Sequence, residues 1–354
     1  MHIHFDKDHL DNVKQNHDKW WDGTIGRPLV CITRPEIYPS ATDKDITLPS
    51  QANCNDFSIS PTELIKNWDL YKSDERYEGD AYPHINFAFY GPGILAAMCG
   101  GRLDNSSGAV WFYPGEKTEL KDIRPHYDPD NKWAKRIKDI YYAGLEYWNG
   151  SVIMGMPDLG GVLDVAASLR GTQNLLTDLY DDPEEVLRLI NDVRIAWYDA
   201  YNDFAEVLKP QGAYSDWCGL LSTEPSYIIQ CDFCYMISNT MFRKFVLPTL
   251  KNDTEKLSHT IYHLDGIGEL KHLDDVLSLE KLNAVQWVAG AEQPPAPEWL
   301  DVYKKITAAN KKYMLCGSCD DYFSVLEKLH GEPYYNCWVN ADEDELAEKL
   351  LKTR

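Results

Sequence analysis

The feature that most constrains the fold is a repeated alternation of short apolar runs with longer segments of helical periodicity. The runs are rich in β-branched and aromatic residues and are bounded by Gly, Asp, Asn or Pro, as buried strands are. Because strands that alternate with helices form a parallel sheet covered by helices, the pattern predicts the α/β class. The eight runs are Leu29–Arg34, Ile85–Gly91, Val152–Asp158, Gly212–Cys218, Thr260–Gly266, Ala284–Gly290, Lys312–Ser318 and Tyr334–Asn340.

Segments with helical periodicity separate or follow most of these runs. Eight strand units favour closure into a (β/α)8 TIM barrel over an open doubly wound sheet, because no glycine-rich phosphate turn follows the first run. We therefore expect one barrel domain over residues 81–354. The predicted helices are Asn131–Asn149, Pro183–Lys209, Asn239–Ser258, Leu270–Leu279, Pro297–Asn310, Asp320–Leu329 and Asp342–Leu351.

Two parts of the chain do not fit the repeat. Residues 1–80 contain an amphipathic segment (Leu10–Trp21), a strand and a polar loop rich in Asp, Thr, Ser and Pro. We expect them to form an N-terminal extension that caps one end of the barrel. The segment Ser106–Ile123 has strand-like stretches on either side of Pro114 and Gly115, a pattern that predicts an inserted β-hairpin.

The balance of charge restricts the partners that we expect. The 354-residue chain has 56 Asp and Glu against 35 Lys and Arg, a formal net charge of -21, and no compact basic block. Nucleic acid and anionic membranes are therefore poor partners. No apolar run approaches the ~20 residues that span a bilayer, and the N-terminus has no apolar signal region, so we expect a cytoplasmic protein. In that reducing compartment, the nine cysteines favour free thiols or metal ligands over disulfides.

The carboxyl ends of the strands are where a parallel barrel carries its reactive side chains. His263 and Asp265 lie two residues apart on one predicted strand, so both point to the same face just before Gly266. With Cys337 from the last strand, they would form a set of three ligands that leaves a fourth position open, as in catalytic zinc sites. Alternatively, Asp265 orients His263, and Cys337 is a small core residue.

Other strand ends supply further candidates. Carboxylates in such a place can act as general acids or bases, although each can also cap a loop, and aromatic side chains there can wall a pocket or fill a core. Of two C-x-x-C pairs, Cys231 with Cys234 is interpreted as buried thiols, whereas a thiol role for Cys316 at the rim stays open. The candidate catalytic residues are Asp158, Asp216 and Tyr214, and the candidate pocket residues are Trp217, Gln286, Trp287, Trp338 and Cys316.

Longer motifs carry a resemblance to a known family. The stretch Val152-Ile-Met-Gly-Met-Pro is similar to a G-x-P strand, and Leu179-Tyr-Asp-Asp-Pro-Glu-Glu-Val is similar to a D-x-P-E-x-V helix start. Phe242-Arg-Lys-Phe-Val-Leu-Pro is similar to a segment that reads F-x-x-F-x-x-P. In these motifs, from about Ile85 onward, the chain resembles the uroporphyrinogen decarboxylase superfamily. The resemblance implies a (β/α)8 barrel, in agreement with the strand count.

Within the superfamily, the chain is closer to the cobalamin-dependent, corrinoid-linked methyltransferases. Ile261-Tyr-His-Leu-Asp-Gly resembles their H-x-C-G strand end, and Tyr335-Asn-Cys-Trp resembles the region of their second cysteine. The resemblance implies zinc held by His263, Asp265 and Cys337, with Asp265 in place of the usual cysteine. It also implies a partner protein that carries a corrinoid, and a small O-, N- or S-methyl substrate or thiol acceptor.

Two other functions remain open at this stage. The first is a metal-independent decarboxylase that uses Asp158 or Asp216 on a smaller substrate. The polyanionic porphyrinogen itself is disfavoured, because the arginine-rich motif of true uroporphyrinogen decarboxylases is missing around Gly26-Arg-Pro-Leu-Val. The second is a barrel without catalytic activity that serves as a binding partner.

Overall fold

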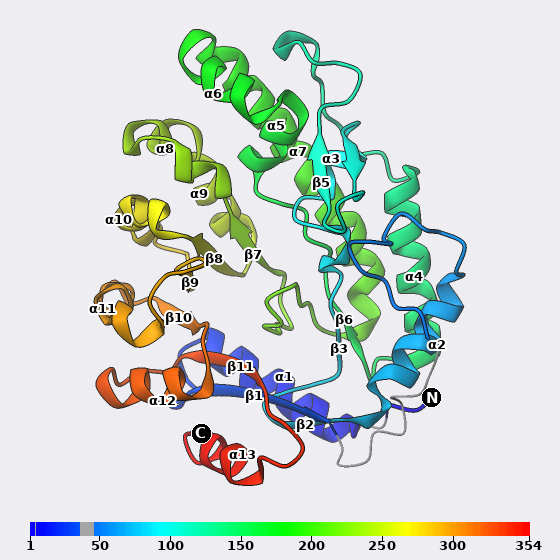
Figure 1. The fold of residues 1–354 in the computed structure, drawn as a ribbon, viewed down its shortest axis with the longest axis vertical. Helices are drawn as coiled ribbons and strands as arrows, with labels where there is room; N and C mark the ends of the chain where they lie inside the picture. Colours follow the sequence, from blue (N-terminus) through cyan, green and yellow to red (C-terminus); the bar gives the residue numbers. More distant parts are fainter. Residues whose placement is uncertain (4, 36–45) are drawn as a thin grey trace.

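The parallel sheet predicted from the alternating pattern is present (Figure 1). The computed structural model describes residues 1–3, 5–35 and 46–354. In this part of the chain, a seven-stranded sheet has the order β2-β1-β11-β10-β9-β8-β7, and all its neighbouring strands are parallel except β1 and β2. Its strands are β1 (Leu29–Pro35), β2 (Glu75–Gly79), β7 (Ser226–Gln230), β8 (His259–Asp265), β9 (Ala284–Val288), β10 (Lys312–Leu315) and β11 (Tyr334–Trp338). The α/β class is therefore confirmed.

A closed barrel is not shown by the strand ladders. The short strands β3 (His84–Ile85) and β6 (Ile153–Met154) pair in parallel as a separate sheet, and within the described residues no strand ladder joins them to the larger one. Polar side chains bridge the gap beside β6 instead. The Gln211 amide bonds both the N–H and the C=O of Met154 at 3.0 Å, and the Asp216 carboxylate accepts the Ile228 N–H at 2.7 Å.

The predicted strand Gly212–Cys218 is wrong, and the strand of this region lies further along, at β7. Residues 212–218 make a single isolated bridge, between Tyr214 and Ser222. Gly212 and Gly219 have φ angles of 71° and 74°, which L side chains rarely adopt, so the chain turns at both positions. The five residues of β7 that follow are all buried.

Thirteen α-helices lie in the described part of the chain, and seven predicted helical segments match them closely. Four helices were not predicted, α2, α3, α5 and α6. The N-cap of α7, Asp182, accepts the Glu185 N–H at 3.4 Å. Figure 1 shows α8, α10, α11 and α12 following one another along one side of the sheet. The helices are α1 (Lys7–Trp21), α2 (Pro61–Tyr71), α3 (Leu95–Met98), α4 (Lys132–Trp148), α5 (Val162–Arg170), α6 (Thr172–Asp181), α7 (Pro183–Leu208), α8 (Asn239–Phe245), α9 (Leu247–Lys256), α10 (Leu273–Leu277), α11 (Leu300–Ala308), α12 (Cys319–Lys328) and α13 (Asp344–Leu351).

The two departures from the repeat are both present in altered form. The hairpin pairs β4 (Arg102–Asp104) with β5 (Trp111–Tyr113), so its turn precedes the predicted one at Pro114 and Gly115. The N-terminal segment contributes β1 and β2 to the main sheet, so it does more than cap one end, and Trp20 of α1 is buried. The predicted polar loop falls partly on residues 36–45, which lie outside the described residues. No helix among the described residues is long and apolar enough to span a membrane.

The register of the strands separates two faces of the main sheet. Residues aligned across neighbouring parallel strands point to the same side, and the side alternates along each strand. One face carries one aligned residue from each strand from β7 to β11: Gln230, His263, Gln286, Met314 and Tyr334. The intervening residues point to the opposite face.

Candidate functional site

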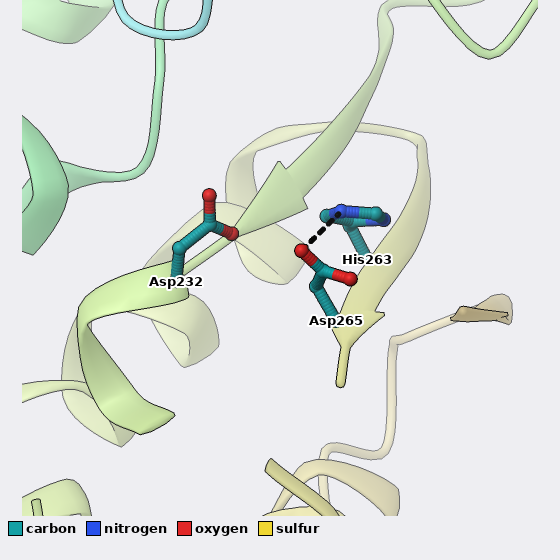
Figure 2. Close-up of side chains that lie close together, drawn as sticks. All are labelled: Asp232, His263 and Asp265. Atoms are coloured by element: carbon teal, nitrogen blue, oxygen red, sulfur yellow. Dashed lines mark ion pairs between the residues drawn. The ribbon is translucent and has the colours of Figure 1, made fainter. Parts of the chain in front are cut away.

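Three potential metal ligands converge at the carboxyl ends of two neighbouring strands. His263 and Asp265 project from the same face of β8, and Asp232 begins the 3-10 helix η5 (Asp232–Met236) directly after β7 (Figure 2). One ligand atom from each residue lies within 4.8 Å of the others, and His263 Nε2 is 4.0 Å from Asp265 Oδ2. Because β7 and β8 are parallel neighbours, a residue after the first strand meets the end of the second. We call these three residues the acidic cluster.

The imidazole of His263 is oriented by its neighbours. Its Nδ1 lies 2.5 Å from the Gln286 amide oxygen, which accepts the Nδ1 proton and leaves the Nε2 lone pair toward the acidic cluster. The Trp217 ring packs edge-on against the imidazole, with 5.0 Å between ring centroids. A histidine held in this tautomer is ready to bind a cation through Nε2.

Further buried acids surround the acidic cluster. Burial and neighbouring carboxylates raise the pKa of Asp158 to about 7 and that of Asp164 to about 8. Burial and the nearby Cys234 and Asp232 raise the pKa of Glu269 to about 11. Glu269 is fully buried, and its Oε1 has no hydrogen-bond partner among the described residues. Within that part of the chain, no Lys or Arg forms an ion pair with any of these acids, so the protein supplies no counter-ion for their ionised forms.

This donor set fits a divalent cation. Two carboxylates and one neutral imidazole are ligands that Zn²⁺ accepts, and three protein ligands leave the open position of a catalytic site. The carboxylates also repel one another: partial desolvation at the protein surface and the charge of Asp265 raise the pKa of Asp232. A bound cation would remove that repulsion. Oxygen ligands are harder than thiolates, so a metal here would be a strong Lewis acid toward oxygen.

The structure does not bring the predicted ligand Cys337 into the acidic cluster. Cys337 lies in register with Ile32 and next to Trp338, on the face of the sheet opposite to His263. Its Sγ is 3.7 Å from the Cys31 carbonyl oxygen. Alternation along β11 therefore separates it from His263, and Asp232 takes the third place. Asp232 was not predicted as a ligand, because β7 was not recognised as a strand.

The three predicted catalytic residues lie in different surroundings. Asp158 is buried, and its Oδ1 accepts the Gly160 N–H at 2.9 Å. Asp216 is also buried, with a pKa that burial raises to about 6, and it accepts backbone N–H groups that tie the chain to β7. Tyr214 lies elsewhere: its backbone pairs with Ser222, and the charges near its hydroxyl are those of Lys209, Glu206 and Glu224.

The predicted pocket residues divide between the two faces. Trp217 and Gln286 contact His263, and the Cys316 thiol interacts with Gln286, while burial raises its pKa to about 11. Trp287 faces the other side and packs against Trp299, with 5.4 Å between ring centroids. Trp338 is exposed and lines a cavity. As interpreted, Cys231 and Cys234 are both buried.

Two hollows are lined by strands of the main sheet. A polar depression of about 930 Å³ is lined by the amino ends of β8, β9 and β10, away from the acidic cluster. A cavity of about 370 Å³ is lined by β1, β3 and β11. The second hollow is on the face that carries His263, because Tyr334 in its wall is in register with that face.

Comparison with known proteins gives a likeness of fold. No protein-family model matches the sequence, and no curated protein matches it. A methyltransferase from Methanosarcina mazei has a similar structure, with a TM-score of 0.60 and 13% sequence identity. The match covers 96% of this chain and 97% of that chain. The chain therefore has, over nearly its whole length, a fold similar to that of this methyltransferase.

Proposed function

We propose that the chain is a zinc-dependent methyltransferase that moves a methyl group between a small methyl compound and a corrinoid held by a partner protein. The observation that carries the proposal is the acidic cluster, whose three ligand atoms converge at the strand ends without a compensating cation. The likeness of fold to a methyltransferase supports the same reading. We also propose that β3 and β6 complete a (β/α)8 barrel with the main sheet.

Asp232, His263 and Asp265 would hold the metal. When bound, zinc supplies a Lewis acid that polarises the heteroatom of the methyl compound, and the partner's corrinoid supplies the cobalt that gives or takes the methyl group. Gln286 keeps the His263 lone pair directed at the acidic cluster. Trp217 covers the imidazole and limits the access of water.

A second candidate, a metal-independent decarboxylase, is favoured by one observation. Burial raises the pKa of Asp158 to about 7, which suits a general acid at neutral pH. This reading uses neither Asp232 nor His263. It predicts activity that survives chelation and is lost in Asp158→Asn.

The proposed methyltransferase is tested with free cob(I)alamin, kept reduced by titanium(III), in place of the partner protein. The protein is stripped with a chelator, reloaded with zinc and mixed with 2-methoxyethanol, trimethylamine or dimethyl sulfide. We expect methylcobalamin to form, seen by its absorbance, with at least one donor and only after reloading.

Matched variants separate the metal site from general effects of charge. Asp265→Asn removes a ligand and should lower the rate by about 100-fold, as loss of metal-site residues does. Asp301→Asn removes an exposed carboxylate that pairs with Lys304 and should leave the rate unchanged. Equal rates before and after chelation would contradict the proposal.

A further inference from the structure

Two cysteine thiols meet where α12 packs against β11, and the proposed function uses neither of them. All nine cysteines lie within the described residues, and Cys319 and Cys337 are among the four that are partly exposed. Cys319 is the first residue of α12, and Cys337 lies near the end of β11. The pair is separate from the acidic cluster, because Cys337 is on the face of the sheet opposite to His263.

Tyr335 holds the two thiols on one side of β11. Tyr335 and Cys337 are two residues apart on the strand, so their side chains point to the same face. The Tyr335 hydroxyl donates to Cys319 Sγ at 3.5 Å and to the Gly317 carbonyl oxygen at 3.2 Å, and its ring stacks on that of Tyr322 in α12. The Cys337 thiol interacts with the same Cys319 sulfur. The two thiols are therefore neighbours across the contact between α12 and β11.

The C-x-x-C spacing does not pair Cys319 with Cys316. The Cys316 thiol interacts with the amide of Gln286, whose side chain is on the face of the main sheet that carries His263. The Cys319 thiol instead contacts Tyr335 and Cys337 on the opposite side. A disulfide forms only between sulfurs whose Cβ atoms are close and directed at one another. Cys337 is therefore the partner that the fold offers to Cys319.

The two thiols differ in a way that suits oxidation in two steps. The thiolate is the form that reacts with peroxides, and it is stabilised at a helix N-terminus, where backbone N–H groups are unpaired. Cys319 occupies that place in α12, and Tyr335 adds an O–H donor. The Asp321 carboxylate of the same turn accepts the N–H and the hydroxyl of Ser318, at 2.9 and 2.8 Å. Burial and the neighbouring Cys319 raise the pKa of the Cys337 thiol, so Cys337 stays protonated until its partner has been oxidised.

We propose that Cys319 and Cys337 are an oxidation site, at which a hydroperoxide forms a disulfide that joins α12 to β11. In the first step, the Cys319 thiolate attacks one oxygen of hydrogen peroxide, the O–O bond breaks, and the other oxygen takes a proton and leaves as water. In the second step, the Cys337 sulfur attacks the resulting sulfenic acid, the S–O bond breaks, and a second water leaves with the Cys337 proton. The two thiols lose two electrons and two protons, and the peroxide is reduced to two water molecules.

The proposal is tested by treating the chelator-stripped protein with equimolar hydrogen peroxide. The remaining free thiols are blocked with N-ethylmaleimide in denaturant, and the peptides are mapped by mass spectrometry without reduction. We expect a disulfide between Cys319 and Cys337 that dithiothreitol reverses, whereas the buried Cys231 and Cys234 stay reduced. A disulfide between Cys316 and Cys319, or none at the proposed pair, would overturn the proposal.

Single variants assign the two steps to the two thiols. Cys337→Ser removes the second step, so sulfenic acid should persist at Cys319 and be trapped by dimedone. Cys319→Ser should slow the consumption of peroxide by about tenfold. Cys99→Ser is the matched control and should leave it unchanged, because Cys99 is also partly exposed but follows the end of α3. Equally fast dimedone labelling of Cys337 in Cys319→Ser would contradict the order of the steps.

Tyr335→Phe separates reactivity from packing. This variant keeps the ring that stacks on Tyr322 and removes only the O–H donor. We expect the second-order rate constant of Cys319 with peroxide to fall by about tenfold, because hydrogen bonds to charged groups are stronger than those to neutral ones. The disulfide should still form, since both thiols are present. An unchanged rate constant would contradict the role of the Tyr335 hydroxyl in the site.

Discussion

Two buried acidic regions of the molecule have opposite electrostatics. Beside the start of β1, both oxygens of Asp80 pair with Arg27, at 2.7 and 2.9 Å, and Arg354 adds a third contact at 2.8 Å. Burial alone would raise the pKa of Asp80, but the hydrogen bonds and charges of the two arginines lower it below its usual value. Around the acidic cluster, in contrast, burial raises the pKa values of Asp158 and Glu269, and within the described residues no arginine or lysine pairs with them.

The difference shows which buried acids are paired with the protein's own arginines and which have no counter-ion from the protein. Asp80 is compensated by the protein's own residues and so belongs to the structure. A group of acids that the fold brings together without a counter-ion destabilises the fold, and such clusters mark functional sites. We therefore interpret the acidic cluster as the place of an external cation.

The largest expected effect concerns the compensated region. Asp80→Ala should lower the free energy of unfolding by about 3–5 kcal/mol, because it leaves two arginines next to a buried site without their partner. Urea denaturation at pH 7 measures this change. A loss below about 1 kcal/mol would show that the Asp80 pairs are no stronger than surface ion pairs.

The next effect is a pH dependence of opposite sign in the other region. An acid whose pKa is raised by folding binds more protons in the folded state than in the unfolded state. The free energy of unfolding of the protein therefore falls as the pH rises from the unfolded pKa of that acid to its folded pKa. For Asp158 that window runs from the usual value of 3.8 to about 7. In metal-free protein, Asp158→Asn should remove about 3 kcal/mol of the decline between pH 4 and pH 7.

Urea denaturation across this pH range makes the comparison with Asp80. Because the pKa of Asp80 is lowered, the stability it contributes is present at neutral pH and is lost only as the pH falls below its usual value. Protonation of Asp80 should therefore lower the free energy of unfolding at acidic pH, whereas ionisation of Asp158 should lower it toward neutral pH. The same pH profile in the wild-type protein and in Asp158→Asn would break the comparison.

A smaller effect is expected from a ligand of the acidic cluster. Asp232→Asn should stabilise the metal-free protein by about 0.5 kcal/mol, since it removes repulsion from Asp265. The value is small because the Asp232 side chain is exposed, and solvent screens the repulsion. Thermal unfolding of the chelator-treated protein measures it. Destabilisation would mean that the carboxylate has a structural partner.

The smallest effect is expected at Glu269. Its pKa of about 11, raised by burial, means that the carboxyl is protonated at pH 7, and glutamine has nearly the same shape. Glu269→Gln should therefore change the free energy of unfolding by less than about 0.5 kcal/mol. A loss above about 2 kcal/mol would indicate that Glu269 is ionised and paired.

Much of the fold could be predicted from the sequence because most of its strands are buried apolar runs bounded by turn residues. This holds for β8, β9, β10 and β11, each of which was placed within a few residues. It fails where side chains replace ladder bonds, as with Gln211 and Met154, because nothing in the local pattern shows such a bridge. Residues 212–218 alternate as a strand does but form none. The strand Ser226–Gln230 was missed because both of its end residues are polar.

The candidate site could be predicted only in part. His263 and Asp265 lie on one strand, so their convergence follows from a period of two residues. The third ligand depends on the register between strands, which the sequence does not encode locally. Cys337 and His263 fall on opposite faces for that reason, whereas Asp232 follows the unrecognised β7.

The central claim is that Asp232, His263 and Asp265 form a site for a divalent cation, and zinc titration of the chelator-stripped protein by calorimetry tests it most directly. We predict one zinc ion per chain, affinity about 100-fold weaker in Asp232→Asn, and unchanged affinity in Cys337→Ser. Stoichiometric binding that survives Asp232→Asn and is lost in Cys337→Ser would contradict the account.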